Sequence, residues 1–379
     1  MTDFAELALL PEGLHDDLPP FAGHEALSIE RLVAQFEAHG YERVKPPLIE
    51  FEESLLAGPG AGVARHMFRL MDPISQRMMG LRADMTTQVA RIAATRLKEA
   101  PRPLRLCYAG QVLRVRGSQL RPERQYAQAG VELIGAEGVA GDAEVVLLAA
   151  EALQALGVQG LSVDLTAPSL VPLLTQSLGL EGEEAEAARQ ALDARDGAAI
   201  ETLAPQVRQQ LGDLMRAAGP ADGALECLAG LTLPAPARAL CDHLADLVAC
   251  LNMGRGDLTL TIDPGESRGF EYQTGMSFSL FAEGVRGELG RGGRYPLASG
   301  ESATGFTLYL DSLMRAVPGR EAARRLYLPF GTTGAQARRL RADGWTTVQG
   351  LEDTATPEDE ARRLACEHIL RGGEPAALA

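Results

Sequence analysis

The order of apolar and polar positions predicts a chain in which helices alternate with strands. Residues 24–39 place apolar side chains every three or four positions, as one buried face of a helix requires, and Gly40 ends the pattern. The next segment, YERVKPPLIEF, predicts a strand. Because proline cannot donate a hydrogen bond to a sheet, Pro46 and Pro47 favour an edge or an interface position for this strand.

A short hairpin and a helix are expected next. Residues 67–70 and 77–81 form the predicted hairpin, which turns at Asp72–Pro73. Asp84 is a candidate N-cap for the helix that follows. Asp84 and Thr86 therefore lie where a strand gives way to a helix, and such junctions often face ligands. A plain helix cap is an equally good interpretation of Asp84 taken alone.

A longer hairpin over residues 104–135 holds most of the candidate chemistry. Residues 105–115 predict its first strand and residues 126–134 its return strand. Because residues separated by an even number share one face of a strand, Gln128 and Glu132 lie on the same side. Around the connecting loop lie four arginines, Arg114, Arg116, Arg121 and Arg124. The pattern predicts a ligand site, and a solvated hairpin with incidental charges is the alternative.

The rest of the chain divides into an insertion, a second β-rich stretch and a tail. Residues 167 to about 252 are rich in Ala, Leu and Glu at helical spacing, which indicates a helical insertion. Strand patterns return from Leu258, and residues 303–317, ATGFTLYLDSLMRAV, predict a helix. Residues 319–379 are expected to form a small C-terminal α/β domain, and residues 1–318 the core.

Composition narrows the class of protein. The formal net charge of −15 argues against general affinity for nucleic acid, although 34 of the 36 basic residues are arginine and cluster locally. The five cysteines have neither C-x-x-C pairing nor zinc-type spacing, which favours reduced thiols in a cytoplasmic setting. No secretory segment or membrane span is expected. We expect a soluble protein with no metal and no cofactor.

Several motifs in fixed order resemble the catalytic core of class II histidyl-tRNA synthetases. They are VKPPLIE, VLR before the Arg-rich loop, GVELIG, SRGFEY, GGRY and the GF-headed helix expected after it. The resemblance covers about residues 8–317, including the helical insertion. It implies an α+β fold, a class II aminoacyl-tRNA synthetase-like antiparallel sheet flanked by helices, which dimerises through the proline-containing strand.

Departures from the synthetase pattern fall on its nucleotide side. The resemblance places Arg114 where the synthetases hold the α-phosphate of ATP, but Arg116 stands where they carry a nucleotide-binding glutamate. Seven residues after Gly305, the arginine of the synthetases is replaced by Ser312, and Arg315 is displaced by roughly 4.5 Å along a helix. Adenylation needs preorganised cations around the developing negative charge, so a degenerate nucleotide site is expected.

The amino-acid side of the pocket is better preserved. By resemblance, the expected histidine-binding residues are Asp84, Thr86, Gln128, Glu132, Arg268 and Tyr272. Carboxylates suit the ammonium group, a guanidinium suits the carboxylate, and Glu132 can accept from an imidazole N–H. Two departures alter this side: Asp84 is shorter than the usual glutamate, and Gln273 replaces a tyrosine.

A synthetase fold with a damaged nucleotide site and a short tail resembles the regulatory subunits of ATP phosphoribosyltransferase. That resemblance implies a non-catalytic chain that activates a short catalytic subunit in a hetero-octamer. It also implies feedback inhibition by histidine in the first step of histidine biosynthesis. A divergent histidyl-tRNA synthetase, or a binding module that kept the scaffold, is the alternative. No residue is expected to be catalytic.

Overall fold

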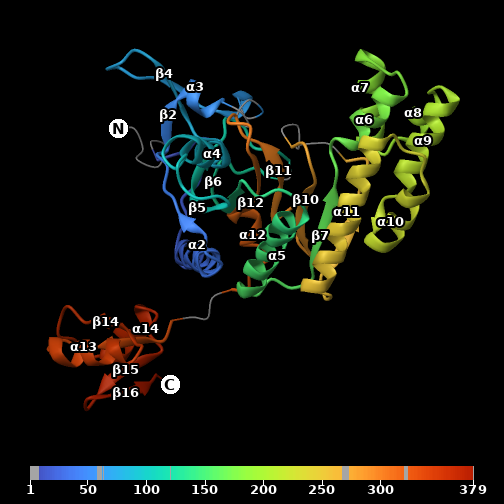
Figure 1. Cartoon of the computed structure of the whole chain (residues 1–379). Coiled ribbons are helices and arrows are strands. Elements are labelled where there is room, and N and C mark those ends of the chain that lie inside the picture. Colours follow the sequence, from blue (N-terminus) through green and yellow to red (C-terminus); the bar gives the residue numbers. More distant parts are fainter. Residues whose placement is uncertain are drawn as a thin grey trace. The chain divides into compact units, whose positions relative to one another are not determined.

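The computed structural model describes residues 8–57, 62, 64–119, 121–266, 273–319 and 323–378. The chain forms two compact units, Met1–Pro318 and Gly319–Ala379. Figure 1 shows the larger unit built around one broad sheet. In the described residues this sheet has nine strands, in the order β1 (Glu42–Arg43), β5 (Leu104–Leu113), β6 (Gln125–Ile134), β12 (Ser302–Tyr309), β11 (Gly290–Pro296), β10 (Ser277–Ala282), β7 (Leu161–Thr166), β9 (Thr259–Ile262) and β8 (Gly219–Pro220).

Neighbouring strands of this sheet run antiparallel except at β1–β5 and β7–β9. The central pair is the predicted long hairpin, in which Tyr108 on β5 lies opposite Gly130 on β6. On the other side of β6, Glu132 lies opposite Gly305 of β12. The antiparallel sheet flanked by helices that the synthetase resemblance implied is therefore confirmed.

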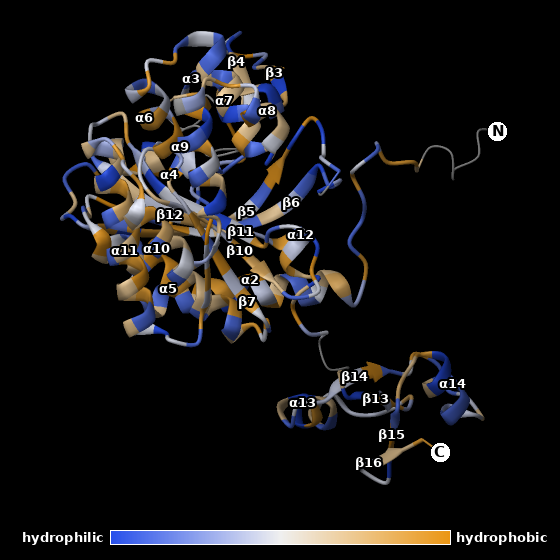
Figure 2. Ribbon diagram, turned by 90° about the vertical axis from the view of Figure 1, so that its right-hand side faces the viewer, coloured by the Kyte–Doolittle hydropathy of each residue, from blue (hydrophilic) through white to orange (hydrophobic). Residues whose placement is uncertain are grey.

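Helices cover both faces of the sheet. Helices α2 (Phe21–Ala38) and α5 (Val139–Ala155) pack on one face against alternate residues of β6, such as Val131 and Leu133. Helix α4 (Thr86–Thr95) packs on the other face, against residues of β6 such as Tyr126 and Ile134. Apolar segments in α5, α11 and the strands are visible in Figure 2. Because strand residues alternate between faces, Gln128 and Glu132 belong to the face covered by α4.

A second, three-stranded sheet forms from the proline-containing segment and the short hairpin. Its order is β2 (Ile49–Phe51), β4 (Met78–Leu81) and β3 (Arg69–Met71), with α3 (Glu52–Leu55) following β2. The prediction of one strand through YERVKPPLIEF is wrong. Pro46 and Pro47 lack N–H donors, and they separate β1 in the large sheet from β2 in the small one.

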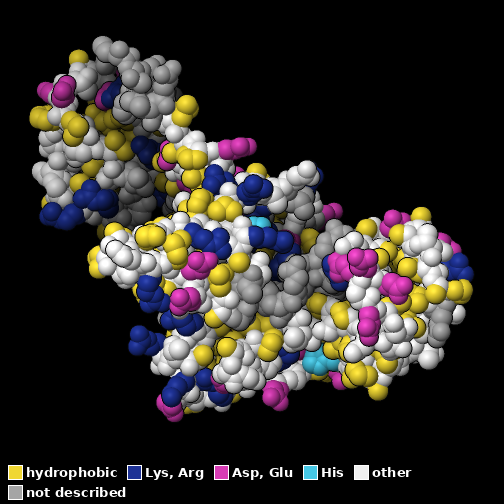
Figure 3. Space-filling model, turned by 90° about the horizontal axis from the view of Figure 1, so that it is seen from above, with side chains coloured by type: hydrophobic (Ala, Val, Ile, Leu, Met, Phe, Trp, Pro, Cys, Tyr) yellow, Lys and Arg dark blue, Asp and Glu magenta, His cyan; other side chains and the backbone are white. Residues whose placement is uncertain are grey.

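Six helices follow β7 in the described part of the chain and gather at one end of the large sheet (Figure 1). They are α6 (Leu170–Ser177), α7 (Gly182–Asp193), α8 (Gly197–Glu201), α9 (Pro205–Arg216), α10 (Ala221–Gly230) and α11 (Ala235–Gly254), with β8 between α9 and α10. Acidic side chains predominate on the part of Figure 3 drawn over these helices, whereas arginine gathers over the core. None of the helices described here combines the length and apolar character needed to cross a bilayer.

Two local predictions are wrong. Residues 303–317 were predicted as one helix, but they form β12 and then the short helix α12 (Leu310–Leu313). Strand β12 lies between β6 and β11 and is buried on both faces, so its sequence, SATGFTLY, lacks the regular apolar–polar alternation that identifies a strand. Asp84 is not the N-cap of α4. Met85 holds that position, and Asp84 accepts from the backbone N–H of Thr86 at 2.9 Å.

The smaller unit combines helices with one sheet, whose strand order is β14 (Thr346–Gln349), β13 (Arg325–Leu328), β15 (His368–Arg371) and β16 (Glu374–Ala377). Strand β13 pairs in parallel with both β14 and β15. Helix α13 (Gly334–Ala342) packs against Leu326 and Leu328, and α14 (Pro357–Arg363) packs against Tyr327. Because alternate residues of β13 point to opposite faces, the two helices cover opposite sides of this sheet.

Candidate functional site

The centre of the candidate site is the carboxyl group of Glu132 on β6. Its side chain is only 1% exposed. The Tyr295 hydroxyl donates to Glu132 Oε2 at 2.7 Å, and the Tyr108 hydroxyl approaches Oε1 at 3.4 Å. Gly305 makes room for this carboxyl, because a Cβ at that position would lie 2.2 Å from Glu132 Oε2. The absence of a side chain at Gly305 therefore allows β12 to pass beside a buried acid.

Burial raises the pKa of Glu132 to about 8. Hydrogen bonds from Tyr295, Thr86 and Tyr108 oppose that rise, and the neighbouring Asp84 carboxylate adds to it. Removing a carboxylate from water disfavours its charged form, and here the three hydroxyl donors do not fully compensate. Glu132 is therefore mostly protonated at neutral pH when the pocket holds only protein atoms. A polar ligand with an N–H or a positive charge would favour the carboxylate form.

Asp84 and Gln128 form a second polar pair beside Glu132. The Gln128 side chain is fully buried, and its Nε2 donates to Asp84 Oδ2 at 3.2 Å. Its Oε1 accepts from the backbone N–H of Met85 at 3.2 Å. Asp84 is half-buried, and its other oxygen accepts from the Thr86 N–H. The amide thus holds a partly accessible carboxylate in a fixed orientation at the start of α4.

A hydroxyl network connects this pair with Glu132. The Thr86 hydroxyl and the Tyr108 hydroxyl lie 3.3 Å apart, and Tyr108 and Thr307 share a hydrogen bond of 2.7 Å. Burial raises the pKa of Tyr108 well above its usual value, so the phenol stays protonated as a donor. The network fixes the position of the Glu132 carboxyl from the side of β5.

Four of the six predicted histidine-binding residues therefore lie together. Asp84, Thr86, Gln128 and Glu132 come from the start of α4 and from β6. Thr86 and Glu132 line one small cavity together with Gln273, Tyr295, Gly305 and Thr307. The other two predicted residues, Arg268 and Tyr272, lie outside the described residues.

Sequence reasoning missed the hydroxyl donors of this site, which are Tyr108, Tyr295 and Thr307. Tyr295 belongs to the GGRY motif that carried the resemblance, and this was the available signal for it. Tyr108 reaches Glu132, and Thr307 reaches Tyr108, only through the register of β5 and β12 with β6. That register is a long-range property without a local sequence signal.

A second hollow holds most of the predicted nucleotide side. Arg114 and Ser312 both line it, together with Ser118, Arg121, Glu288, Arg291 and Tyr309. Arg121 forms ion pairs of 3.3 Å with both Glu288 and Asp311, and its guanidinium lies 3.7 Å from the Tyr309 ring centre. Arg291 pairs with Glu288 at 2.7 Å. Carboxylates of the chain therefore already neutralise two of the three guanidinium groups in this hollow.

The other nucleotide-side positions lie elsewhere. Arg116 is exposed and lines a separate hollow beside Glu12 and Arg124. Ser312 is buried at 2% exposure, and its hydroxyl accepts from the Arg315 guanidinium at 3.1 Å. Arg315 thus binds Ser312 and does not line the hollow that holds Arg114. Among the residues described by the structure, no group of acidic, histidine or cysteine side chains could hold a metal ion.

Comparison with known proteins agrees with this geometry. Residues 13–313 match the family Histidyl-tRNA synthetase. The chain is 56% identical over 368 residues to the ATP phosphoribosyltransferase regulatory subunit of Rhodospirillum centenum, covering 97% of this chain and 95% of that one. It is 55% identical to the protein of that name from Paramagnetospirillum magneticum, covering 98% of both chains.

A solved structure shares the fold. It is an ATP phosphoribosyltransferase regulatory subunit/histidyl-tRNA synthetase from Bacillus halodurans, which superposes with a TM-score of 0.82 at 24% identity. The match covers 94% of this chain and 96% of that chain. The motifs, the fold and the full-length relatives agree, and the chain belongs to the ATP phosphoribosyltransferase regulatory subunit family, which is built on the histidyl-tRNA synthetase fold.

Proposed function

We propose that this chain is a non-catalytic regulatory subunit of ATP phosphoribosyltransferase. It activates a short catalytic subunit in the first step of histidine biosynthesis and senses histidine in the pocket around Glu132. The observation that carries the proposal is a contrast within one fold. The acids and amide of the amino-acid side lie together, whereas two of the three arginines on the nucleotide side, Arg121 and Arg291, are already paired with carboxylates.

The nucleotide side argues against adenylation. Catalysis at an α-phosphate needs cations that are free to meet the charge developing in the transition state. Arg121 is instead held by Glu288 and Asp311, and Ser312 brings no charge. Arg114 alone would have to stabilise the negative charge that develops at the α-phosphate, a charge that the synthetases stabilise with a second arginine. These pairings support a chain that keeps the synthetase scaffold without its reaction.

The amino-acid side supports recognition of histidine. The half-buried Asp84 carboxylate suits an ammonium group, and Gln128 holds it in place. Glu132 suits an imidazole N–H, since a ligand donor would replace the proton that burial keeps on this carboxyl. Arg268 is proposed to meet the ligand carboxylate, with Tyr272 beside it.

The proposed partners are a second copy of this chain and the short catalytic subunit, together forming a hetero-octamer. Self-association is proposed through the three-stranded sheet, where large apolar side chains are exposed: Leu48, Ile49, Met71, Ile74 and Met78. A cytoplasmic location is proposed because all five cysteines are unpaired. Histidine can regulate the assembly only if it binds the active and inhibited forms with different affinities.

Reconstitution tests this proposal. The purified chain is mixed with a short-form catalytic subunit, and phosphoribosyl transfer from phosphoribosyl pyrophosphate to ATP is measured with and without histidine. We expect the chain to form a complex, raise the rate severalfold and make it sensitive to histidine. Robust ATP–pyrophosphate exchange with histidine by the chain alone would instead indicate a synthetase and would overturn the proposal.

A further inference from the structure

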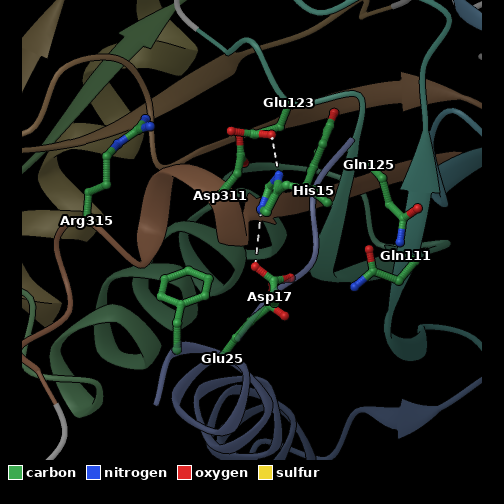
Figure 4. A pocket seen from close by; sticks show the side chains of 10 residues that line it. His15, Asp17, Glu25, Gln111, Glu123, Gln125, Asp311 and Arg315 are labelled. Carbon is green, nitrogen blue, oxygen red and sulfur yellow. Dashed lines mark hydrogen bonds and ion pairs between the residues drawn. The ribbon is translucent and has the colours of Figure 1, made fainter. Parts of the chain in front are cut away.

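A separate acidic pocket lies at the far end of the long hairpin. It is formed where the N-terminal lead-in, α2, the ends of β5 and β6, and α12 meet (Figure 4). Including its open mouth, the hollow measures about 580 Å³. It shares no lining residue with the three hollows described above, so it is distinct from all of them.

Four carboxylates from separate segments converge on this pocket: Asp17, Glu25, Glu123 and Asp311. His15 lies between two of them, 3.2 Å from Asp17 and 3.0 Å from Glu123. Burial, together with the nearby Asp17 and Asp311 carboxylates, raises the pKa of Glu25. The one arginine on the wall, Arg315, donates to Ser312. The pocket therefore has an excess of negative charge.

Two buried polar groups on the pocket wall, the Asp311 carboxylate and the Tyr126 hydroxyl, lack side-chain hydrogen-bond partners among the described residues. The Asp311 side chain is 6% exposed, and within the described residues its carboxylate has no side-chain hydrogen-bond donor, only the adjacent backbone N–H of Ser312. Its contact is the ion pair with Arg121 at 3.3 Å. The Tyr126 side chain is 3% exposed, and its buried hydroxyl also has no partner among these residues. Buried polar atoms are normally satisfied, so these two indicate that donors are missing.

We propose that this pocket binds an organic cation with N–H donors, a guanidinium or an ammonium group. Such a group supplies positive charge to the carboxylates and several N–H bonds to the unsatisfied oxygens. The half-exposed ring of Phe21 provides an apolar and cation-attracting wall. The described carboxylates do not cluster closely enough for a metal ion. The cation comes either from a free small molecule or from an arginine or lysine side chain of the catalytic subunit.

Glu25 is the residue to change, because its side chain forms no hydrogen bond or ion pair within the described structure. Glu25→Gln keeps its shape and removes its charge. Glu30→Gln is the matched control, since Glu30 lies on the same helix and its exposed carboxylate contacts only Arg43 among the described residues. Butylguanidinium is the probe, and butylurea is its neutral counterpart. Binding to the full chain is measured by ligand-detected NMR.

If the ligand is a free small-molecule cation, butylguanidinium should bind at least tenfold more tightly than butylurea. Glu25→Gln should remove this preference, and Glu30→Gln should not. A cationic side chain of the partner predicts a different result. Neither probe then binds, but Glu25→Gln weakens association with the catalytic subunit at least tenfold while Glu30→Gln does not. The proposal is overturned if butylguanidinium shows no charge-dependent binding and Glu25→Gln leaves subunit association unchanged.

Discussion

Replacing Glu132 by glutamine should change how the stability of the core depends on pH. Burial raises the pKa of this carboxyl from about 4.5 to about 8, so the folded protein holds a proton that the unfolded chain releases above pH 4.5. Between these two values the folded state binds more protons, and the free energy of unfolding falls as the pH rises. Glutamine resembles the protonated acid in shape and has no such dependence.

The expected magnitude follows from the size of the pKa change. Each tenfold change in proton affinity corresponds to about 1.4 kcal/mol. The contribution of Glu132 should therefore fall by up to about 1.4 kcal/mol for each pH unit between 4.5 and 8, or by about 5 kcal/mol in all. Relative to wild type, Glu132→Gln should become steadily more stable across this range and level off above pH 8.

Urea unfolding at a series of pH values measures this difference. Far-UV circular dichroism follows mainly the large core, whereas fluorescence of the single tryptophan, Trp345, follows the small C-terminal unit and should not change. Glu144→Gln is the control, because a hydrogen bond from Arg105 lowers the pKa of Glu144, and its contribution is lost only in acid. A wild-type minus Glu132→Gln difference that does not vary between pH 5 and 8 would refute the reasoning.

Three further substitutions test the site around Glu132 and the hollow lined by Arg114 and Arg121. Gln128→Leu should lower the free energy of unfolding by about 1–3 kcal/mol, because it leaves the buried Met85 N–H and the Asp84 carboxylate without their partner. Gln125→Leu, at the exposed end of β6, is the control and should change this free energy by less than about 0.5 kcal/mol in the same urea titration. Arg121→Leu should cost about 3 kcal/mol, since two partly buried carboxylates lose their cation, and Arg116→Leu on the surface should cost almost nothing. Ser312→Arg alone should give no ATP–pyrophosphate exchange with histidine, and measurable exchange would show that a single missing cation separates this chain from an adenylating enzyme.

The sequence predicted those parts of the site that depend on local spacing. The even separation of Gln128 and Glu132 correctly placed both on one face of β6. The strand-to-helix junction indicated only that Asp84 could face a ligand, and the resemblance to the synthetases placed Asp84 in the same pocket, where it contacts Gln128. Asp84 was nevertheless assigned the wrong local role. It precedes the N-cap and accepts from the Thr86 N–H, because the residue that enters the helix is Met85.

Long-range pairing explains most of what the sequence did not reveal. Tyr295 reaches Glu132 because β11, β12 and β6 are neighbours in the sheet, an order that no short segment encodes. The segment from Ala303 to Tyr309 was predicted as helix because its apolar residues also fit a helical spacing, but it is a strand buried on both faces. The pairing of Arg121 with Asp311 likewise joins residues that lie far apart in the chain.

Histidine titration of the assembled complex tests the central claim most directly. Inhibition of phosphoribosyl transfer is measured for complexes that contain wild type, Glu132→Gln or, as the control on the nucleotide side, Arg114→Ala. The account predicts that Glu132→Gln raises the histidine concentration for half-inhibition at least tenfold while the uninhibited rate is retained, and that Arg114→Ala leaves this concentration unchanged. Equal histidine sensitivity of wild type and Glu132→Gln would contradict the assignment of the Glu132 pocket as the histidine sensor.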